Sequence, residues 1–128
     1  MLEKLEIYQT AFDLMVHIEE CVRDFSRYFK YTVGSELRQM CSGILSKTAA
    51  FNDRKLTEKA AFCRELRGDI RQLQIKLDVC EKLNCFKRYK AWYKAASYTA
   101  DLLKQCERLH EYFAKNDERQ NQGGGRPQ

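Results

Sequence analysis

The chain has 128 residues, a single-domain length, of which 44% are hydrophobic and 32% are charged, so it is typical neither of disordered chains nor of membrane proteins. One proline and six glycines are too few for the closely spaced turns of a β-sandwich or barrel, which leaves an all-α fold. The net charge of +5 is regional: residues 54–94 hold twelve Lys/Arg and five Asp/Glu, for +7, and the remainder carries −2. Such a region favours a polyanionic partner, with a solvated Lys/Arg-rich helix face as the alternative.

The first helix is expected over residues 2–24, with two adjacent apolar rows that form a face wide enough to pack against at least two neighbours. The pattern breaks over residues 25–31, and Thr32 is the expected N-cap of a second helix that ends near Phe51. Small residues in that second helix lower its helix propensity, so we expect close packing to explain them. They are Gly34, Ser42, Gly43 and Ser46.

The third helix is predicted over residues 56–83 and the fourth over residues 88–115, each with a regular 3-4 apolar repeat. Four amphipathic helices with short loops predict an up-down-up-down antiparallel four-helix bundle over residues 1–115. Residues 116–128 contain no apolar side chain and are expected to form a disordered tail.

The cysteines and the N-terminus point to a reduced, cytoplasmic protein. The six cysteines include no Cys-x-x-Cys pair, and five of them fall on apolar helix stripes, where a thiol packs as a small hydrophobic group. They are Cys21, Cys41, Cys63, Cys80, Cys85 and Cys106. The N-terminus lacks the apolar core of a signal peptide, and no stretch approaches the roughly 18 apolar residues of a membrane span.

Catalytic patterns are missing from the sequence. His17 and His110 lie in no nucleophile motif, and there is no Gly-rich phosphate loop. Glu107-x-x-His110 has the spacing of a di-iron ligand pair, but a bundle needs two such motifs and the second is lacking. We therefore expect Glu107 and His110 to flank the core and face solvent, with no catalytic site, metal or cofactor.

Three arginines of the third helix share one face. Arg64, Arg67 and Arg71 recur at i, i+3 and i+7, each one position after a core residue, so they border the core. Glu65 and Asp69 lie at spacings that pair poorly with these arginines. Guanidinium groups placed this way suit carboxylates within the bundle or phosphates outside it.

The segment 86–98 alternates aromatic and basic side chains, a composition that suits base stacking combined with phosphate contacts. Trp92 lies on the apolar repeat and is expected in the core, whereas Tyr89 is open to either interpretation. The remaining candidates for a nucleic-acid-binding surface are Lys87, Arg88, Lys90, Tyr93 and Lys94.

Short motifs link residues 5–113 to a known family. They are Phe25-x-Arg27 and Tyr31-Thr-x-Gly34 after the first helix, and Leu66-Arg67-x-x-Ile70-Arg71 in the third. With the four-helix pattern, they make the chain similar to small bacterial four-helix-bundle proteins. That family includes proteins encoded in ribosomal RNA intervening sequences and the accessory variability proteins (Avd) of diversity-generating retroelements, whose Leu-Arg-x-x-Leu-Arg pattern the third motif resembles. The Gly-Gly-Trp-like end of the accessory variability branch is replaced by residues 109–113, and its proline after the first helix by Ser26.

The resemblance implies a homopentamer with a basic central barrel that binds RNA and DNA and associates with the retroelement's reverse transcriptase. In that role the protein supports mutagenic copying of a template repeat. Arg67 and Arg71 match the motif arginines, whereas Arg64 comes from the stripe alone.

Three functions follow as hypotheses. The first is the non-enzymatic reverse-transcriptase subunit, and the second is a protein–protein scaffold of the intervening-sequence type whose basic face docks an acidic partner. The third, a metal-dependent enzyme, has the weakest basis in the sequence.

Overall fold

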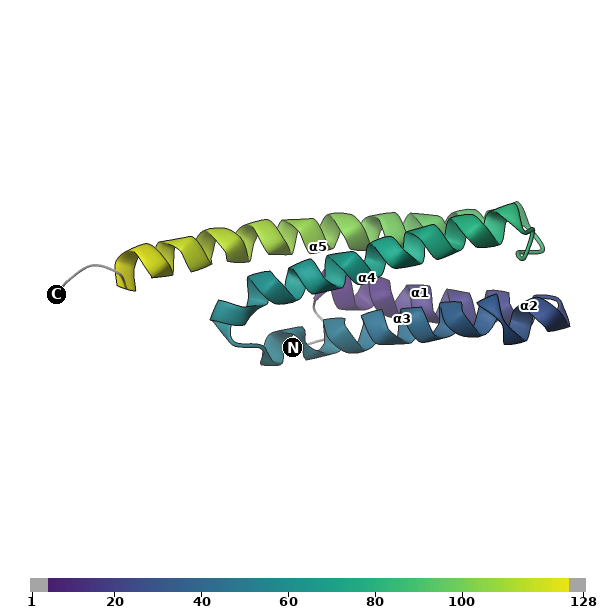
Figure 1. Ribbon diagram of the computed structural model, residues 1–128, viewed down its shortest axis with the longest axis horizontal. Coiled ribbons are helices and arrows are strands. Elements are labelled where there is room, and N and C mark those ends of the chain that lie inside the picture. The colour runs from purple at the N-terminus through teal and green to yellow at the C-terminus, as the bar shows by residue number, and fades with distance from the viewer. Residues whose placement is uncertain (1–4, 125–128) are drawn as a thin grey trace.

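The computed structural model describes the backbone of residues 5–124 and the side chains of residues 5–116. These residues are all-α and contain no strand. Four long helices build a four-helix bundle (Figure 1). They are α1 (Glu6–Arg23), α3 (Val33–Ala50), α4 (Leu56–Lys82) and α5 (Tyr89–Gly124), with a short α2 (Arg27–Tyr31) between α1 and α3 and a 3-10 turn, η2 (Phe51–Asp53), after α3.

The four long helices surround one apolar core. α1 packs against α3 and α5, and α4 packs against the same two helices, so α1 and α4 lie at opposite corners of the bundle. The 3-4 repeats supply the buried side chains, among them Leu14, Leu37, Leu66 and Leu102. Leu56 was expected in the third repeat but is exposed, because it is the first residue of α4.

The break between the first two helices contains a helical segment of its own, α2. The expected N-cap role of Thr32 is wrong for its side chain: the hydroxyl donates backwards to the Tyr28 carbonyl at 2.7 Å. Thr32 therefore helps to end α2, and α3 begins without a side-chain cap.

The end of α4 fixes where the basic start of α5 lies. Asn84 adopts the left-handed conformation with φ of 58°. Its N–H donates to the Glu81 carbonyl at 3.1 Å, and the Cys85 N–H donates to the Cys80 carbonyl at 2.9 Å, which together make a Schellman motif. The chain reverses here, so Lys87 and the residues after it lie at this end of the bundle.

The last helix is longer than expected. α5 continues past the expected end at Lys115 to Gly124, and it projects beyond the other helices as a tail (Figure 1). Residues 116–122 contain Glu, Arg and Gln, which have good helix propensity, and no residue that breaks a helix comes before the glycines at 123–125. Helix α5 therefore extends into the segment expected to form the tail, and residues 125–128 lie outside the described residues.

Candidate nucleic-acid interface

The arginine stripe lies on the side of α4 next to α5. Arg64 and Arg71 are exposed, whereas Arg67 is half-buried near Cys106. Arg71 donates from Nη2 to Oε1 of Glu107 on α5 at 3.5 Å. One member of the stripe is therefore neutralised across the helix pair, which spacing within α4 alone did not reveal.

The two acids of the same helix turns are bound by a different helix. Lys47 of α3 donates to Glu65 at 2.9 Å and also to Asp69. Burial opposes the charge on Lys47, but its hydrogen bonds to Asp69 and Glu65 outweigh burial and raise its pKa; the same contact lowers the pKa of Glu65. Because these acids face α3, no ion pair within residues 5–116 neutralises Arg64 or Arg67.

The start of α5 carries an exposed aromatic pair. Tyr89 and Tyr93 are 66% and 60% exposed, and their ring centroids lie 6.2 Å apart. Trp92 was expected in the core but is only half-buried, and its indole N–H donates to the Leu77 carbonyl of α4 at 2.9 Å. Tyr89 thus belongs to the surface. Tyr93 is off the apolar repeat, and Tyr89 precedes it by four residues and so shares its helix face. This spacing is the sequence signal that could have placed Tyr89 on the surface.

Lys94 and Arg88 lie towards α1. The Lys94 ammonium lies 5.8 Å from the centroid of the Tyr98 ring. Lys87 and Arg88 line a small hollow of about 160 Å³ together with His17 and Cys21. Burial and then the carboxylates of Glu20 and Asp24 raise the pKa of the Cys21 thiol to about 11, although Lys94 and Arg88 oppose them. This thiol is therefore protonated near neutral pH and is a poor nucleophile.

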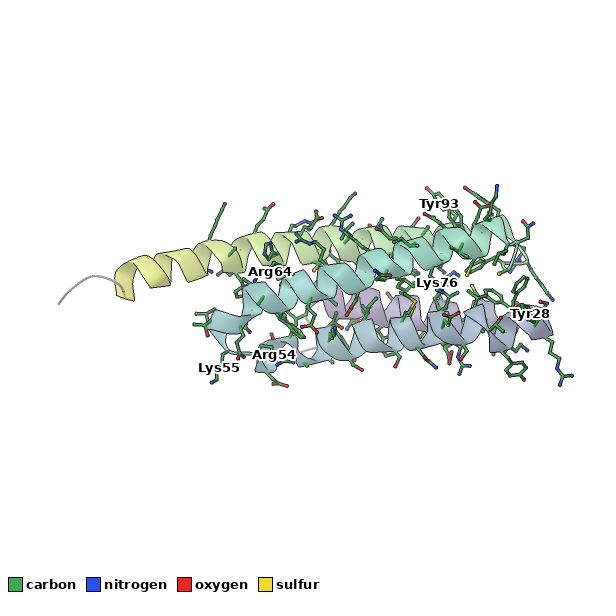
Figure 2. The ribbon with its side chains drawn as sticks, viewed as in Figure 1. Tyr28, Arg54, Lys55, Arg64, Lys76 and Tyr93 are labelled. Carbon is green, nitrogen blue, oxygen red and sulfur yellow. The ribbon has the colours of Figure 1, made fainter. Side chains whose placement is uncertain are left out.

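The candidate residues form two groups along the bundle. Figure 2 draws Arg64 well along α4 from the end at which Tyr93 and the α4–α5 connection lie. From Arg71 to Lys82 alone α4 rises about 16 Å. The arginine stripe and the cluster at the start of α5 therefore form an elongated surface rather than one compact pocket.

Several basic residues of segment 54–94 are occupied within the protein. The guanidinium of Arg54 lies 4.6 Å from the Phe62 ring centroid, and Lys59 lies 4.8 Å from that of Phe51. Lys76 donates to Glu36 at 3.1 Å, between α4 and α3 (Figure 2). Among the described residues, the basic side chains of this segment without an ion pair or ring contact are Lys55, Arg64, Arg67, Lys82, Lys87, Arg88 and Lys90.

Of Glu107 and His110, which were expected to face solvent, Glu107 does so in part, with a side chain that is 44% exposed, whereas His110 does not. Glu107 is half-buried and holds Arg71, and Nε2 of His110 is buried without a hydrogen-bond partner. No group of three or more His, Cys, Asp or Glu side chains in the described residues is arranged to hold a metal ion. All six cysteines are free thiols, and Cys85 in the connection is buried like those on the helix stripes except Cys21, which is half-buried.

The described residues contain no helix with an apolar stretch long enough to cross a membrane. A scan against protein-family models finds no match for this chain. A search of the curated proteins also finds no match.

Proposed function

We propose that this protein is a non-enzymatic accessory subunit that binds RNA or DNA through α4 and the start of α5. The observation that carries the proposal is that Arg64, Arg67 and Lys87 have no acidic partner among the described residues, and that the basic side chains at the start of α5 lie beside exposed aromatic rings. Arg64, Arg67 and Lys87 supply phosphate contacts, and Tyr89 and Tyr93 offer stacking platforms for unpaired bases.

The proposal includes an up-down-up-down bundle. Contacts between neighbouring helices support it: Glu19 of α1 pairs with Arg38 of α3, and Lys47 of α3 pairs with Glu65 of α4. A short connection then places Trp92 of α5 against Leu77 of α4. In this topology α4 and α5 are antiparallel neighbours, so the arginine stripe and the aromatic pair share one long face.

A salt titration tests nucleic-acid binding. Phosphate contacts release counterions, so the affinity for single-stranded RNA should fall linearly with salt on a double-logarithmic plot. Arg64→Ala combined with Arg67→Ala should weaken binding and lower the slope by about 1.4, which corresponds to two phosphate contacts on a single strand. An unchanged slope in a folded double variant would refute the role of the stripe.

The matched control removes two positive charges elsewhere. Lys104 and Arg108 are exposed on α5, outside the basic segment, and make no ion pair with a described residue. Lys104→Ala combined with Arg108→Ala should leave the slope nearly unchanged. Equal losses in the two double variants would mean that net charge alone governs binding.

The biological setting of the proposal comes from the resemblance to accessory variability proteins. We propose a homopentamer that works in the cytoplasm with the reverse transcriptase of a diversity-generating retroelement, in mutagenic reverse transcription of a template repeat. The free thiols support a reducing compartment. Co-purification with a reverse transcriptase encoded beside this chain tests the partnership. The reverse transcriptase should no longer co-purify when the basic residues of the proposed surface are replaced by acidic ones.

A scaffold without nucleic acid is the second candidate. Exposed apolar side chains on α1 and α4, such as Val16 and Ile75, favour it because such patches mark protein interfaces. A gel-shift experiment with RNA and DNA at physiological salt separates the two functions. If no shift is seen at any protein concentration, nucleic-acid binding is refuted and the scaffold is the remaining function.

A further inference from the structure

A small hollow lies where the chain passes from α4 to α5, at the end of the bundle (Figure 1). Its volume is about 200 Å³. The side chains that line it are Glu81, Asn84, Phe86, Lys87, Tyr89 and Trp92. Pockets for drug-sized ligands measure about 300–1,000 Å³, so this hollow suits one small ring system rather than a larger molecule.

Two of the three aromatic walls of the hollow are fixed from behind. The Trp92 indole N–H donates to the Leu77 carbonyl at 2.9 Å, which holds the indole against α4. The Phe86 ring makes an edge-to-face contact with the buried Phe25 ring, and the two centroids lie 5.0 Å apart. Tyr89 is the exposed wall, with its ring centroid 5.3 Å from that of Trp92. Because most of the hollow is preformed, a flat ring that enters it has little side-chain ordering to offset.

The three polar side chains of the hollow are available to a ligand. The Glu81 carboxylate, the Asn84 amide and the Lys87 ammonium make no hydrogen bond or ion pair with a described residue. A carboxylate accepts hydrogen bonds, an amide both donates and accepts, and an ammonium group attracts an anion. A ligand that matches all three has a flat ring with donors and acceptors at its edge and an attached anionic group. A nucleotide has this chemistry.

We propose that the hollow binds one unpaired nucleotide of a strand, with its base against the rings of Tyr89 and Trp92. Asn84 and Glu81 hydrogen-bond to the edge of the base, and Lys87 pairs with the phosphate. This inference rests on the proposed nucleic-acid binding and names the place at which one base of the strand is held. A base inside a duplex is stacked and paired, so the ligand is a single strand or an unpaired loop. A free mononucleotide has the same chemistry but lacks the strand's contacts with the arginine stripe, so it binds more weakly.

The fluorescence of Trp92 tests the hollow directly, because Trp92 is the only tryptophan of the chain and lines the hollow. Titration with single-stranded RNA should quench it, and AMP should quench it at higher concentration. Ribose 5-phosphate is the matched control, since it has the sugar and phosphate of AMP without the base, and it should leave the fluorescence unchanged. A blunt duplex of the same sequence should also leave it unchanged.

Three variants separate the parts of the hollow. Asn84→Gly removes the amide but keeps the left-handed backbone, which glycine adopts freely, and should weaken RNA binding about fivefold or more. Tyr89→Ala should weaken it about 5- to 150-fold, whereas Tyr89→Phe, which keeps the ring, should bind like the wild type. Asn52→Gly, at an exposed asparagine of η2 at the other end of α4, is the matched control for Asn84→Gly and should leave RNA affinity unchanged.

Other results overturn the proposal and distinguish its failure from that of the proposed function. RNA binding detected by anisotropy with unchanged Trp92 fluorescence would refute the hollow and leave nucleic-acid binding in place. Equal quenching by ribose 5-phosphate, or wild-type affinity in both Asn84→Gly and Tyr89→Ala, would do the same. Quenching by AMP without any binding of RNA would keep the nucleotide site and refute the strand, and no binding of any probe would refute both.

Discussion

Gly34 of α3 lies so close to Val22 of α1 that a Cβ at Gly34 would stand 2.8 Å from Cγ1 of Val22. The same Cβ would stand 2.9 Å from the carbonyl oxygen of Phe29, which is backbone and moves little. Gly34→Ala should therefore push α3 away from α1. We expect it to lower the free energy of unfolding by about 1–3 kcal/mol, measured by urea denaturation followed by circular dichroism.

The matched control is a glycine in open space. A Cβ at Gly68 of α4 would meet no atom within 4 Å, and Gly68 lies in the interior of a helix. Gly68→Ala should raise the free energy of unfolding by about 0.5–1 kcal/mol, because alanine loses less conformational entropy on folding. Equal effects from the two substitutions would contradict the close approach at Gly34.

The same residues separate what the sequence predicts from what it does not. Low helix propensity identified Gly34, Ser42, Gly43 and Ser46 as a group, but only Gly34 is closely packed; Ser42, Gly43 and Ser46 are exposed. A 3-4 repeat defines the core face of a helix with good accuracy. It does not define which neighbour covers each flank, since that depends on how the helices pack.

The candidate site follows the same division. The position of the arginines at the border of the core was predictable from the helical period, and so was the poor pairing of Glu65 and Asp69 with them. The actual partner of Glu65 and Asp69 is Lys47, which lies on another helix, 18 residues from Glu65 in the sequence. The partner of Arg71, Glu107, is likewise on another helix. Contacts of this kind depend on the register between helices, which short motifs do not encode.

The Lys47–Glu65 pair predicts a change in stability with pH. The pKa of Glu65 is lowered in the folded state, so its contribution is present above its ordinary value of 4.5 and is lost as the pH falls through the lowered value. The pKa of Lys47 is raised above 10.5, so its contribution is lost only as the pH rises beyond that value. The pair should therefore stabilise the bundle between about pH 5 and pH 10.

Lys47→Met tests this contribution. The variant should unfold at lower urea concentration than the wild type at pH 7, and the difference should shrink as the pH falls from 5 to 3 and Glu65 is protonated. Lys104→Met, at an exposed lysine without an ion pair, controls for the loss of charge. A difference between Lys47→Met and the wild type that stays constant from pH 7 to pH 3 would rule out the ion pair as its cause.

The thiols should react slowly and in a defined order. Burial raises the pKa of Cys41 and Cys80 to about 12, and burial together with Glu20 raises that of Cys21 to about 11. Because the thiolate is the reactive form, iodoacetamide at pH 7.5 should modify none of them quickly. Cys21 is half-exposed and should be modified first, with a rate that rises about tenfold per pH unit up to pH 10.

Peptide mass mapping over a time course reads this order directly. Cys21→Ser should remove the earliest adduct and leave the later ones at their wild-type rates. Rapid labelling at pH 7 of Cys41 or Cys80, both buried, would mean that the bundle opens far more readily than its closed core implies.

The exposed tyrosines at the start of α5 should contribute to binding of single-stranded nucleic acid without a change in its salt dependence. Base stacking on an aromatic ring contributes about 1–3 kcal/mol, so Tyr93→Ala should weaken RNA binding about 5- to 150-fold. Its salt slope should match that of the wild type, because no phosphate contact is lost.

Tyr112 provides the matched control, since it also lies on α5 and is also 60% exposed, but far along the helix from Tyr93. Tyr112→Ala should leave RNA affinity within about twofold of the wild type, as measured by fluorescence anisotropy at two salt concentrations. Base stacking at the start of α5 is supported only if Tyr93→Ala alone lowers the RNA affinity, and by the same factor at both salt concentrations. If the two alanine variants bind equally well, contact with nucleic acid is limited to the basic side chains.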